Sequence, residues 1–354
     1  MKTIGYAAYN KESELKPFSF ERRQLRENDV SIDIQYCGVC HSDLHQARND
    51  WHGSIYPLVP GHEIVGVVTG VGESVKKYKK GDLVAVGCLV DSCQHCSPCE
   101  SKEEQFCEEG ATQTYNSKDR ISGDITYGGY SDKIVVREEF VLKVPDKMEL
   151  SKVAPILCAG VTTYSPLKEW GVEKGDKVGV VGLGGLGHMA VKLASAMGAE
   201  VTVFTTSDSK VEEAKKLGAN HVVISKDEDQ MKKASKSLDV IIDTVPVAHD
   251  LSPYIQTLDI DGTLIIVGAI DNIPSFHSGL LLGGRKRVAA SVIGGIEVTQ
   301  EVLDFCAEHD IYPECEMIDM QEINTAFERM EKGDVKYRFV IDMKSIEKDK
   351  EKVQ

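Results

Sequence analysis

The sequence predicts an α/β protein in which a doubly wound parallel sheet is inserted into a β-rich domain. Three observations predict this fold: short strand-like runs over the first 150 residues, alternating strand and helix patterns beyond about residue 175, and loss of that alternation after about residue 291. The chain has 354 residues. Since single cores rarely grow beyond about 250–300 residues, we expect two domains.

The β-rich part is predicted from short apolar runs that glycine-rich turns separate. Examples lie at residues 30–36, 64–68, 83–86 and 134–136. Runs of this length between turn residues are typical of strands. We therefore expect the first domain to cover residues 1–152.

Further along, an apolar run at residues 177–181 leads into a glycine cluster at 182–187 and then into a helical pattern. Apolar side chains from Leu186 to Met197 recur at i, i+3, i+4, i+7, i+8 and i+11, which places them on one stripe of a helix. Gly198 ends this helix, and a strand follows at 201–204. The order strand, loop, helix, strand predicts a parallel sheet.

The same alternation continues with a helix at residues 211–217 and strands at 222–224, 240–243 and 264–268. A helix near 299–309 and a last strand at 338–341 follow. We expect the second domain over residues 153–290 and a return to the first domain over 291–354. The tail at 345–354 is rich in charge, which predicts a solvated helix end or disorder.

Composition and charge exclude several classes of protein. Hydrophobic residues make up 42% and charged residues 27%, as in ordinary globular domains. A net charge of −15 repels nucleic acid and anionic membranes, so neither is expected as a partner. No apolar run approaches the ~18 residues of a membrane span, and the first residues lack a signal-peptide pattern. We expect a cytoplasmic protein whose ten cysteines bind metal or do chemistry rather than form disulfides.

Four cysteines are spaced C-x2-C-x2-C-x7-C within one short lobe at about residues 88–112. They are Cys93, Cys96, Cys99 and Cys107. Four thiolates fill every position of a tetrahedral zinc ion, which closes the site to substrate and makes it structural. An iron–sulfur cluster is the alternative metal group, and ordinary loop thiols are the alternative without a metal.

The glycine cluster predicts a nucleotide site, because Gly182, Gly184 and Gly187 follow an apolar strand and open a helix. Glycines there permit a tight turn, and the backbone amides can approach a pyrophosphate at the positive end of the helix. The loop as a whole consists of Gly182, Leu183, Gly184, Gly185, Leu186 and Gly187. The alternative is a structural turn that binds no nucleotide.

A second set of candidate metal ligands is scattered over the chain, at Cys40, His62 and Cys158. Spacing alone does not select these three among ten cysteines and ten histidines. Longer motifs do connect them. These motifs are Cys37-Gly-Val-Cys40-His-Ser-Asp43, Gly61-His62-Glu63-x2-Gly66-x5-Gly72-x2-Val75, Cys158-Ala-Gly-Val-Thr-Thr-Tyr164 and the four-cysteine lobe.

With these motifs the chain resembles the zinc-dependent medium-chain alcohol dehydrogenases over nearly its whole length. Finer segments resemble the cinnamyl alcohol dehydrogenase group, and its bacterial aldehyde-reductase members in particular. These segments are Val59-Pro60-Gly61-His62-Glu63, Gly128-Gly129-Tyr130, Thr162-Thr-Tyr-Ser-Pro-Leu167 and Lys336-Tyr337-Arg338-Phe339. The resemblance implies a GroES-like catalytic domain and a Rossmann domain that binds NADP.

The resemblance implies that Cys40, His62 and Cys158 hold a catalytic zinc ion, whose open fourth position would take water, alcohol or aldehyde. It further implies that Glu63 lies behind the metal and that Asp43 orients the histidine ligand. Ser42 and His45 match the proton relay of the family. Surface side chains are the alternative reading for Asp43 and His45.

The end of the second strand of the parallel sheet is expected to select the cofactor. An NAD enzyme usually presents a carboxylate there, whereas the pattern of the family places Thr205 at that position. Thr206, Ser207 and Lys210 form a plausible site for the 2′-phosphate of NADP, although Asp208 would repel it if it pointed inward.

The resemblance also predicts which residues meet the nicotinamide end of the cofactor. Thr162 is expected to pack near the nicotinamide ring. The backbone at Val267, Ala269 and Ile293 is expected to meet its carboxamide. These apolar strand-end residues have ordinary core packing as the alternative role.

Candidates to line the substrate pocket are Trp51, Leu89, Ile270 and Ile293. An aromatic wall would suit aldehydes similar to benzaldehyde or cinnamaldehyde. The plant lignin enzymes carry a tryptophan shortly after the fourth structural cysteine, where this chain has Thr112-Gln113. The departure favours a broad aldehyde reductase over an enzyme dedicated to monolignol aldehydes.

The sequence therefore predicts a zinc-dependent NADP(H) alcohol dehydrogenase that reduces aliphatic or aromatic aldehydes. We expect two zinc ions per chain and a small-molecule substrate. We also expect a homodimer, because members of the group are often dimeric. One alternative is a zinc-independent quinone or alkene reductase of the same superfamily. The other is a non-enzymatic protein that senses zinc and nucleotide.

Overall fold

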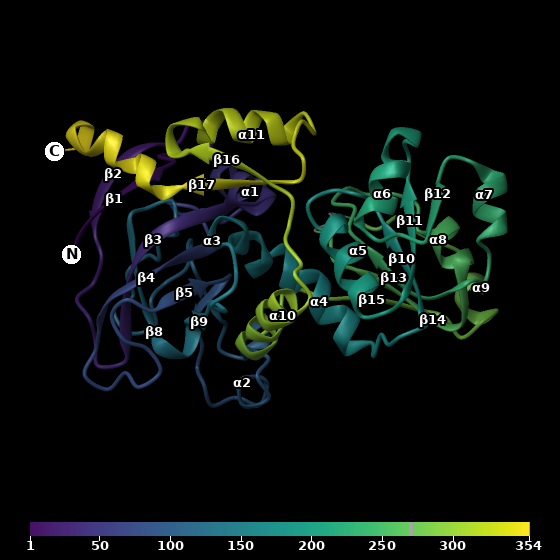
Figure 1. Cartoon of the computed structure of the whole chain (residues 1–354), viewed down its shortest axis with the longest axis horizontal. Helices are drawn as coiled ribbons and strands as arrows, with labels where there is room; N and C mark the ends of the chain where they lie inside the picture. Colours follow the sequence, from purple (N-terminus) through teal and green to yellow (C-terminus); the bar gives the residue numbers. More distant parts are fainter. Residues whose placement is uncertain (269–271, 354) are drawn as a thin grey trace. The chain divides into compact units, whose positions relative to one another are not determined.

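The structure, a computed structural model, describes residues 1–268 and 272–353 of the chain. It contains two compact units (Figure 1). The first combines Met1–Cys158 with the chain from Gly294 onward, and the second consists of Ala159–Ile293. The domain limits expected from the sequence were residues 153–290 for the second unit, with a return at 291.

A mixed sheet forms the centre of the first unit. Its strands follow the order β16 (Cys315–Asp319), β17 (Arg338–Asp342), β3 (Asp29–Val39), β4 (Ile64–Val71), β5 (Leu83–Val86) and β9 (Leu142–Lys143), and β8 (Lys133–Arg137) also pairs with β3. All pairs are antiparallel except β16 with β17. Two small sheets join β1 (Lys2–Ala7) to β2 (Lys16–Glu21) and β6 (Leu89–Asp91) to β7 (Thr112–Gln113).

The long strand β3 determines where the ends of its neighbours lie. Its register pairs Cys37 with Ile64 of β4 on one side and with Ile341 of β17 on the other. The chain before β4 and the start of β17 are thereby brought to the carboxyl end of β3. The helix α1 (His41–Arg48) begins at that same end.

Most helices and turns of this unit are short, and two longer α-helices lie in the returning segment. These two are α10 (Ile296–Glu308) and α11 (Ile323–Glu331). The shorter elements are α2 (Ser97–Glu100), α3 (Leu150–Val153), and the 3-10 turns η1 (Glu104–Phe106), η2 (Glu138–Phe140), η3 (Ala154–Leu157) and η5 (Met320–Glu322).

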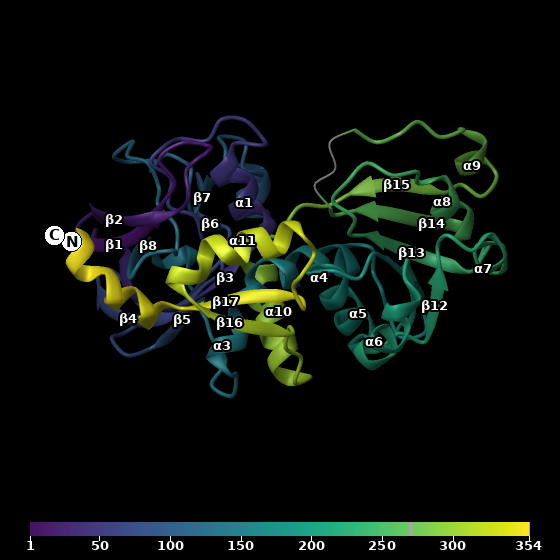
Figure 2. The same ribbon diagram turned by 90° about the horizontal axis from the view of Figure 1, so that it is seen from above.

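The second unit is a six-stranded sheet in which every pair is parallel. Its order is β12 (His221–Ile224), β11 (Glu200–Thr205), β10 (Lys177–Val181), β13 (Leu238–Asp243), β14 (Leu258–Ile266) and β15 (Arg287–Ala290). The order reverses between β10 and β13, which is where doubly wound sheets bind dinucleotides. Figure 2 shows β13, β14 and β15 side by side.

The helices of the second unit connect these strands. They are α4 (Ala159–Glu169), α5 (Gly187–Ala196), α6 (Val211–Leu217), α7 (Glu228–Lys233), α8 (Ser252–Thr257), α9 (Gly279–Leu282) and the turn η4 (Asp208–Lys210). The fold class predicted from the sequence is confirmed. The predicted strand at residues 177–181 and the helix from Leu186 correspond to β10 and α5, because their apolar periodicity is uninterrupted.

The charged tail is helical, as one of the two predicted alternatives had it, but one side of it is buried. Residues Met343–Val353 form the 3-10 helix η6, in which Ile346 and Asp349 are 1% and 0% exposed. Residues three apart lie on the same side of a 3-10 helix, so this pair faces the sheet despite its charged neighbours. The hydroxyl of Tyr6 in β1 donates to Asp349 at 2.5 Å. Among the described residues, no helix is long and apolar enough to cross a membrane.

Asp119 is a charged anchor between two loops of the first unit. Its carboxylate accepts two hydrogen bonds from Arg26, at 2.9 and 3.0 Å, and lies 3.3 Å from Arg23. Partial burial alone would raise the pKa of Asp119, but these arginines and two backbone N–H groups lower it well below its usual value.

A depressed carboxyl pKa stabilises the fold above the pKa of the unfolded chain, near ~3.9, and this contribution is lost as the pH falls. We predict that Asp119→Asn lowers the free energy of unfolding at pH 7. The difference from wild type should shrink between about pH 5 and pH 2. Urea unfolding over a pH series measures it, with Asp124→Asn, an exposed carboxylate of the same loop, as control. A difference that stays constant down to pH 2 contradicts the prediction.

Candidate active site

His62 lies at the centre of a buried hydrogen-bonded group in the first unit. Its Nδ1 is 3.1 Å from Oδ1 of Asp43, and both residues are buried. Burial lowers the pKa of His62, but the carboxylate of Asp43 outweighs this effect and raises the pKa well above its usual value. Because Nδ1 is held by Asp43, Nε2 is the nitrogen left to bind another group.

Asp43 also holds the chain on both sides of the site. It is the third residue of α1 and accepts the N–H of Cys40 at 2.9 Å, which caps the helix. It further accepts the N–H of Gly61 at 2.9 Å and the hydroxyl of Tyr130 at 3.2 Å. The carboxylate thereby fixes α1 against the segment that carries His62.

Two thiols and a second carboxylate complete the group. One ligand atom from each of Cys40, His62, Glu63 and Cys158 lies within 4.8 Å of the others. Hydrogen bonding with Cys158 lowers the pKa of Cys40 well below its usual value, which favours the thiolate. The two Sγ atoms are 3.9 Å apart. Sulfur ligands about 2.3 Å from a tetrahedral zinc ion lie about 3.8 Å from each other, so this group could hold zinc.

Glu63 forms a buried ion pair with Arg338 of β17. Burial raises the pKa of Glu63 to about 7, although the guanidinium of Arg338 opposes the shift. The space is available only because residue 38 is glycine, since a Cβ there would lie 1.9 Å from Oε2 of Glu63. The glycine of the Cys37-Gly-Val-Cys40 motif therefore makes room for this carboxylate.

The four-cysteine lobe forms a separate cluster. Cys93, Cys96, Cys99 and Cys107 lie with their sulfur atoms within 4.8 Å of one another, and all ten cysteines of the chain are free thiols. The backbone N–H groups of Cys93 and Cys96 point at the sulfur atoms of Cys107 and Cys93, at 3.4 and 3.3 Å. Such N–H groups stabilise thiolates, and four thiolates would complete a closed tetrahedral site.

The residues expected to relay protons lie on α1. Ser42 Oγ is 3.5 Å from Sγ of Cys40, and His45 lies one helical turn further, where its Nδ1 is 2.8 Å from Oδ2 of Asp50. The ring of Trp51 is 5.2 Å from that of His45, and Trp51 is 44% exposed. Leu89, by contrast, is buried on β6.

In the second unit the glycine loop connects β10 to α5. Gly182 has a φ of 88°, which glycine adopts far more readily than other residues, and a Cβ on Gly187 would lie 2.1 Å from the carbonyl oxygen of Gly182. A Cβ on Gly184 would have no described atom within 4 Å. The loop, with Leu183, Gly185 and Leu186, therefore has an open side at the start of α5, where backbone N–H groups can receive an anion.

The residues expected to select the cofactor lie at the end of β11 and just after it. Thr205 is buried and stands where an acidic residue would accept a ribose hydroxyl. Lys210 donates from Nζ to the carbonyl oxygen of Leu183 at 2.9 Å, so its ammonium group lies at the glycine loop. Thr206 and Asp208 are exposed, and Ser207 Oγ is 2.7 Å from Ser209 Oγ.

The other cofactor candidates also belong to the second unit. Thr162 is buried on α4, and Val267 donates its N–H to the carbonyl oxygen of Asp243 at 3.0 Å. Ile293 has a φ of 36°, which is rare for a β-branched residue. Ala269 and Ile270 lie outside the described residues.

Arg338, Tyr130 and Cys88 contact the group around His62 but were not among the expected site residues. Arg338 and Tyr130 stand in segments that indicated the family, without an assigned role. An arginine that begins an apolar strand does call for a buried partner, which is a usable signal. The thiol of Cys88 hydrogen-bonds with Cys158, and this lowers the pKa of Cys88. No local pattern points to Cys88.

Comparison with known proteins identifies the family of the chain. Residues 26–146 match the alcohol dehydrogenase GroES-like domain, and residues 185–308 match the zinc-binding dehydrogenase family. The aldehyde reductase YahK of Escherichia coli (strain K12) is 52% identical over 350 residues, which are 98% of this chain and 99% of that protein.

Two solved structures share both units. A cinnamyl alcohol dehydrogenase from Sorghum bicolor is 45% identical with a TM-score of 0.94, covering 97% of this chain and 98% of its own. CAD from Helicobacter pylori, complexed with NADP(H), is 44% identical with a TM-score of 0.91, covering 97% and 99%. On this evidence the chain belongs to the medium-chain alcohol dehydrogenases, in the cinnamyl alcohol dehydrogenase group.

Proposed function

We propose that this alcohol dehydrogenase depends on zinc, uses NADP(H) and reduces aldehydes. The proposal rests on the group of Cys40, His62 and Cys158, in which Asp43 holds the far nitrogen of the histidine. Three such ligands leave one position of a tetrahedral ion for substrate. Bound there, zinc supplies a Lewis acid that polarises the carbonyl group. The four-cysteine lobe would hold a second zinc ion, closed to substrate.

The residues of α1 account for the proton that aldehyde reduction consumes together with a hydride. Ser42 lies beside Cys40, and His45 follows on the same helical face. We infer that the Ser42 hydroxyl gives a proton to the product oxygen and is reprotonated through His45. Asp50 orients the imidazole of His45, because it is 2.8 Å from Nδ1.

The preference for NADP is supported by the end of β11. Thr205 leaves out the carboxylate that would repel a 2′-phosphate, and Lys210 brings an ammonium group to the glycine loop. Asp208 is exposed, so repulsion from it would be screened by solvent. The H. pylori relative was solved with NADP(H).

For substrates we propose aliphatic aldehydes and aromatic aldehydes such as benzaldehyde and cinnamaldehyde. Trp51 next to His45 offers an aromatic surface near the proposed proton relay. The E. coli relative is named an aldehyde reductase and the Sorghum relative a cinnamyl alcohol dehydrogenase. We further propose a homodimer in which β15, at the end of the parallel sheet, pairs with its copy.

The first prediction from this proposal concerns metal and turnover. The purified protein should hold two zinc ions per chain and oxidise NADPH in the presence of benzaldehyde or cinnamaldehyde. Cys40→Ser should retain one zinc ion and lose about a thousandfold or more of kcat/KM, because a Lewis acid contributes several kcal/mol. Metal analysis and the absorbance of NADPH measure both.

Cys306→Ser is the matched control, since Cys306 is a buried cysteine of α10 outside both clusters. It should keep both zinc ions and most of the activity. Turnover without zinc at Cys40 would favour a zinc-independent quinone or alkene reductase. If protein with two zinc ions fails to oxidise NADPH with every aldehyde of a broad panel, a non-enzymatic sensor would be favoured.

The second prediction concerns cofactor choice. Wild type should use NADPH far better than NADH. Lys210→Met should weaken NADPH binding about 10- to 100-fold, which is the range for a lost charged hydrogen bond, and weaken NADH binding much less. Lys215→Met, on the exposed side of α6, is the control. Dissociation constants for NADPH and NADH, measured by fluorescence titration, test this prediction. An equal loss of affinity for both cofactors would mean that Lys210 acts only through its contact with Leu183.

A further inference from the structure

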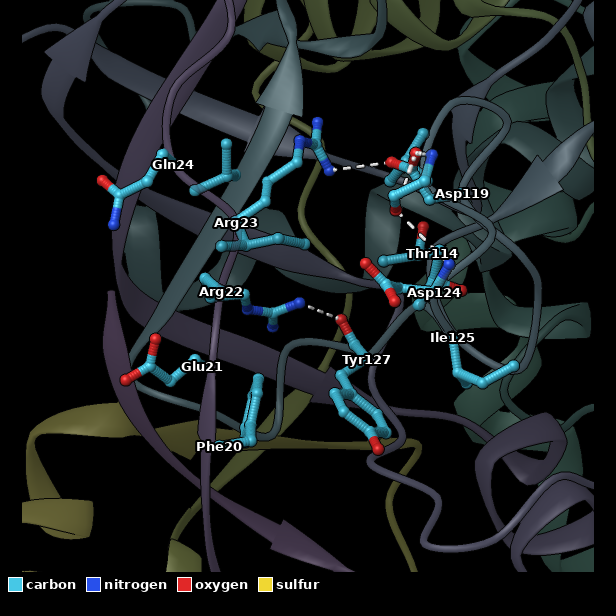
Figure 3. A pocket seen from close by; sticks show the side chains of 15 residues that line it. Phe20, Glu21, Arg22, Arg23, Gln24, Thr114, Asp119, Asp124, Ile125 and Tyr127 are labelled. Atoms are coloured by element: carbon cyan, nitrogen blue, oxygen red, sulfur yellow. Dashed lines mark hydrogen bonds and ion pairs between the residues drawn. The ribbon is translucent and has the colours of Figure 1, made fainter.

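A cavity of about 570 Å³ in the first unit lies between the end of β2, β8 and the loop of residues 114–127. Figure 3 shows Arg22 on its wall, with the guanidinium group directed at Tyr127. This arginine is outside the proposed metal site and has no role in the chemistry derived above.

Arg22 donates to backbone carbonyl groups rather than to a carboxylate. Its guanidinium holds the carbonyl oxygens of Tyr127 at 2.6 Å, Gly128 at 2.9 Å and Lys133 at 3.0 Å, and the hydroxyl of Ser131 at 2.9 Å. Tyr127, Gly128 and Ser131 belong to the turn that precedes β8, and Lys133 is the first residue of β8. One side chain therefore fixes the backbone of that turn from several directions.

The neighbouring arginines of the same segment bind differently. Arg23 pairs with Asp29 and Asp119, and Arg26 pairs with Asp119. None of these three ion pairs involves a residue of 127–133. Arg26 is therefore a matched control for Arg22, since it has the same side chain and a similar position in the sequence.

The turn held by Arg22 packs directly against the residues before His62. Three N–H groups of the turn, from Gly128, Gly129 and Tyr130, donate to the carbonyl oxygens of Val59, Gly61 and Pro60 at 2.8, 2.8 and 2.9 Å. The contact leaves no room for side chains, because a Cβ on Gly61 would lie 2.8 Å from the nitrogen of Tyr130. A shift of the turn would thus move Gly61 and, with it, His62.

Tyr130 provides a second route to the same histidine. Its side chain is 0% exposed, and its hydroxyl donates to Oδ2 of Asp43 at 3.2 Å. The other oxygen of Asp43 accepts the N–H of Gly61 and contacts Nδ1 of His62. The backbone contact and the side-chain contact both lead from the turn to His62.

We propose that Arg22 is a positioning residue that holds His62 in place for its metal through the turn of residues 127–133 and Tyr130. The inference rests on the proposed zinc site. Loss of Arg22 would loosen the site of His62 while leaving the four-cysteine lobe in place. Groups that orient a histidine ligand typically change metal affinity about 10- to 100-fold when they are removed.

The test compares Arg22→Met with Arg26→Met in the zinc-loaded protein. A colorimetric chelator follows zinc release, and Cys40→Ser identifies which phase belongs to the site of His62. Arg22→Met should speed that phase about tenfold or more and leave the phase of the lobe unchanged. Arg26→Met should change neither. The visible spectrum of the cobalt-substituted protein should shift in Arg22→Met only, because it reports the ligand geometry.

Tyr130→Phe removes the hydrogen bond from the hydroxyl of Tyr130 to Asp43. It should speed zinc release from the site of His62 by a smaller factor than Arg22→Met does. If Arg22→Met fails to fold, Arg22→Lys replaces it: it keeps the charge but lacks the planar fork, and it should give an intermediate rate. Equal release rates in the Arg22 and Arg26 variants, or equal acceleration of both phases, would overturn the inference. A wild type without zinc at Cys40 would instead overturn the proposed function.

Discussion

The carboxylate of Asp43 is the constraint on which the geometry around His62 depends. Removing a carboxylate from water costs several kcal/mol unless its oxygens are satisfied. Here the donors come from three distant segments: the start of α1 at Cys40, the approach to β4 at Gly61 and His62, and the turn before β8 at Tyr130. A single buried charge therefore makes these segments mutually dependent, and the position of His62 is fixed only when all three donate to Asp43.

Much of the fold could be predicted from the sequence, because the buried strands are short apolar runs. The predicted runs at residues 83–86 and 177–181 have the same bounds as β5 and β10. β14 begins at Leu258 rather than near residue 264. Residues 259–261 are exposed, so the continuous apolar run that indicates a buried strand starts only after them. The burial of one side of the tail could not be predicted for a related reason. Ile346 and Asp349 face inward among charged neighbours, and composition alone does not show which side of a helix is covered.

Some residues of the candidate sites belong to local sequence motifs, and others come together only in the fold. The four-cysteine lobe and the glycine loop are local patterns, so their spacing is sufficient. Cys40, His62 and Cys158 come from separate segments and became a set only through the resemblance to a family. The partners of Arg22 and Arg338 could not be predicted, although the position of Arg338 at the start of an apolar strand indicates that it has one. Both partners lie far along the chain: 105 residues separate Arg22 from Tyr127, and 275 separate Glu63 from Arg338.

The two units share one way of holding a functional segment. In the first unit Arg22 binds the carbonyl groups of the turn beside His62, and in the second Lys210 binds the carbonyl of Leu183 in the glycine loop. Turns leave carbonyl groups without partners in regular structure, and a cation satisfies them with strong hydrogen bonds. If the cation were paired with a carboxylate side chain instead, its charge would be neutralised and it would not fix the backbone of the loop. A cation placed on carbonyl groups instead fixes the loop and retains its positive charge, which at Lys210 remains available to an anionic ligand.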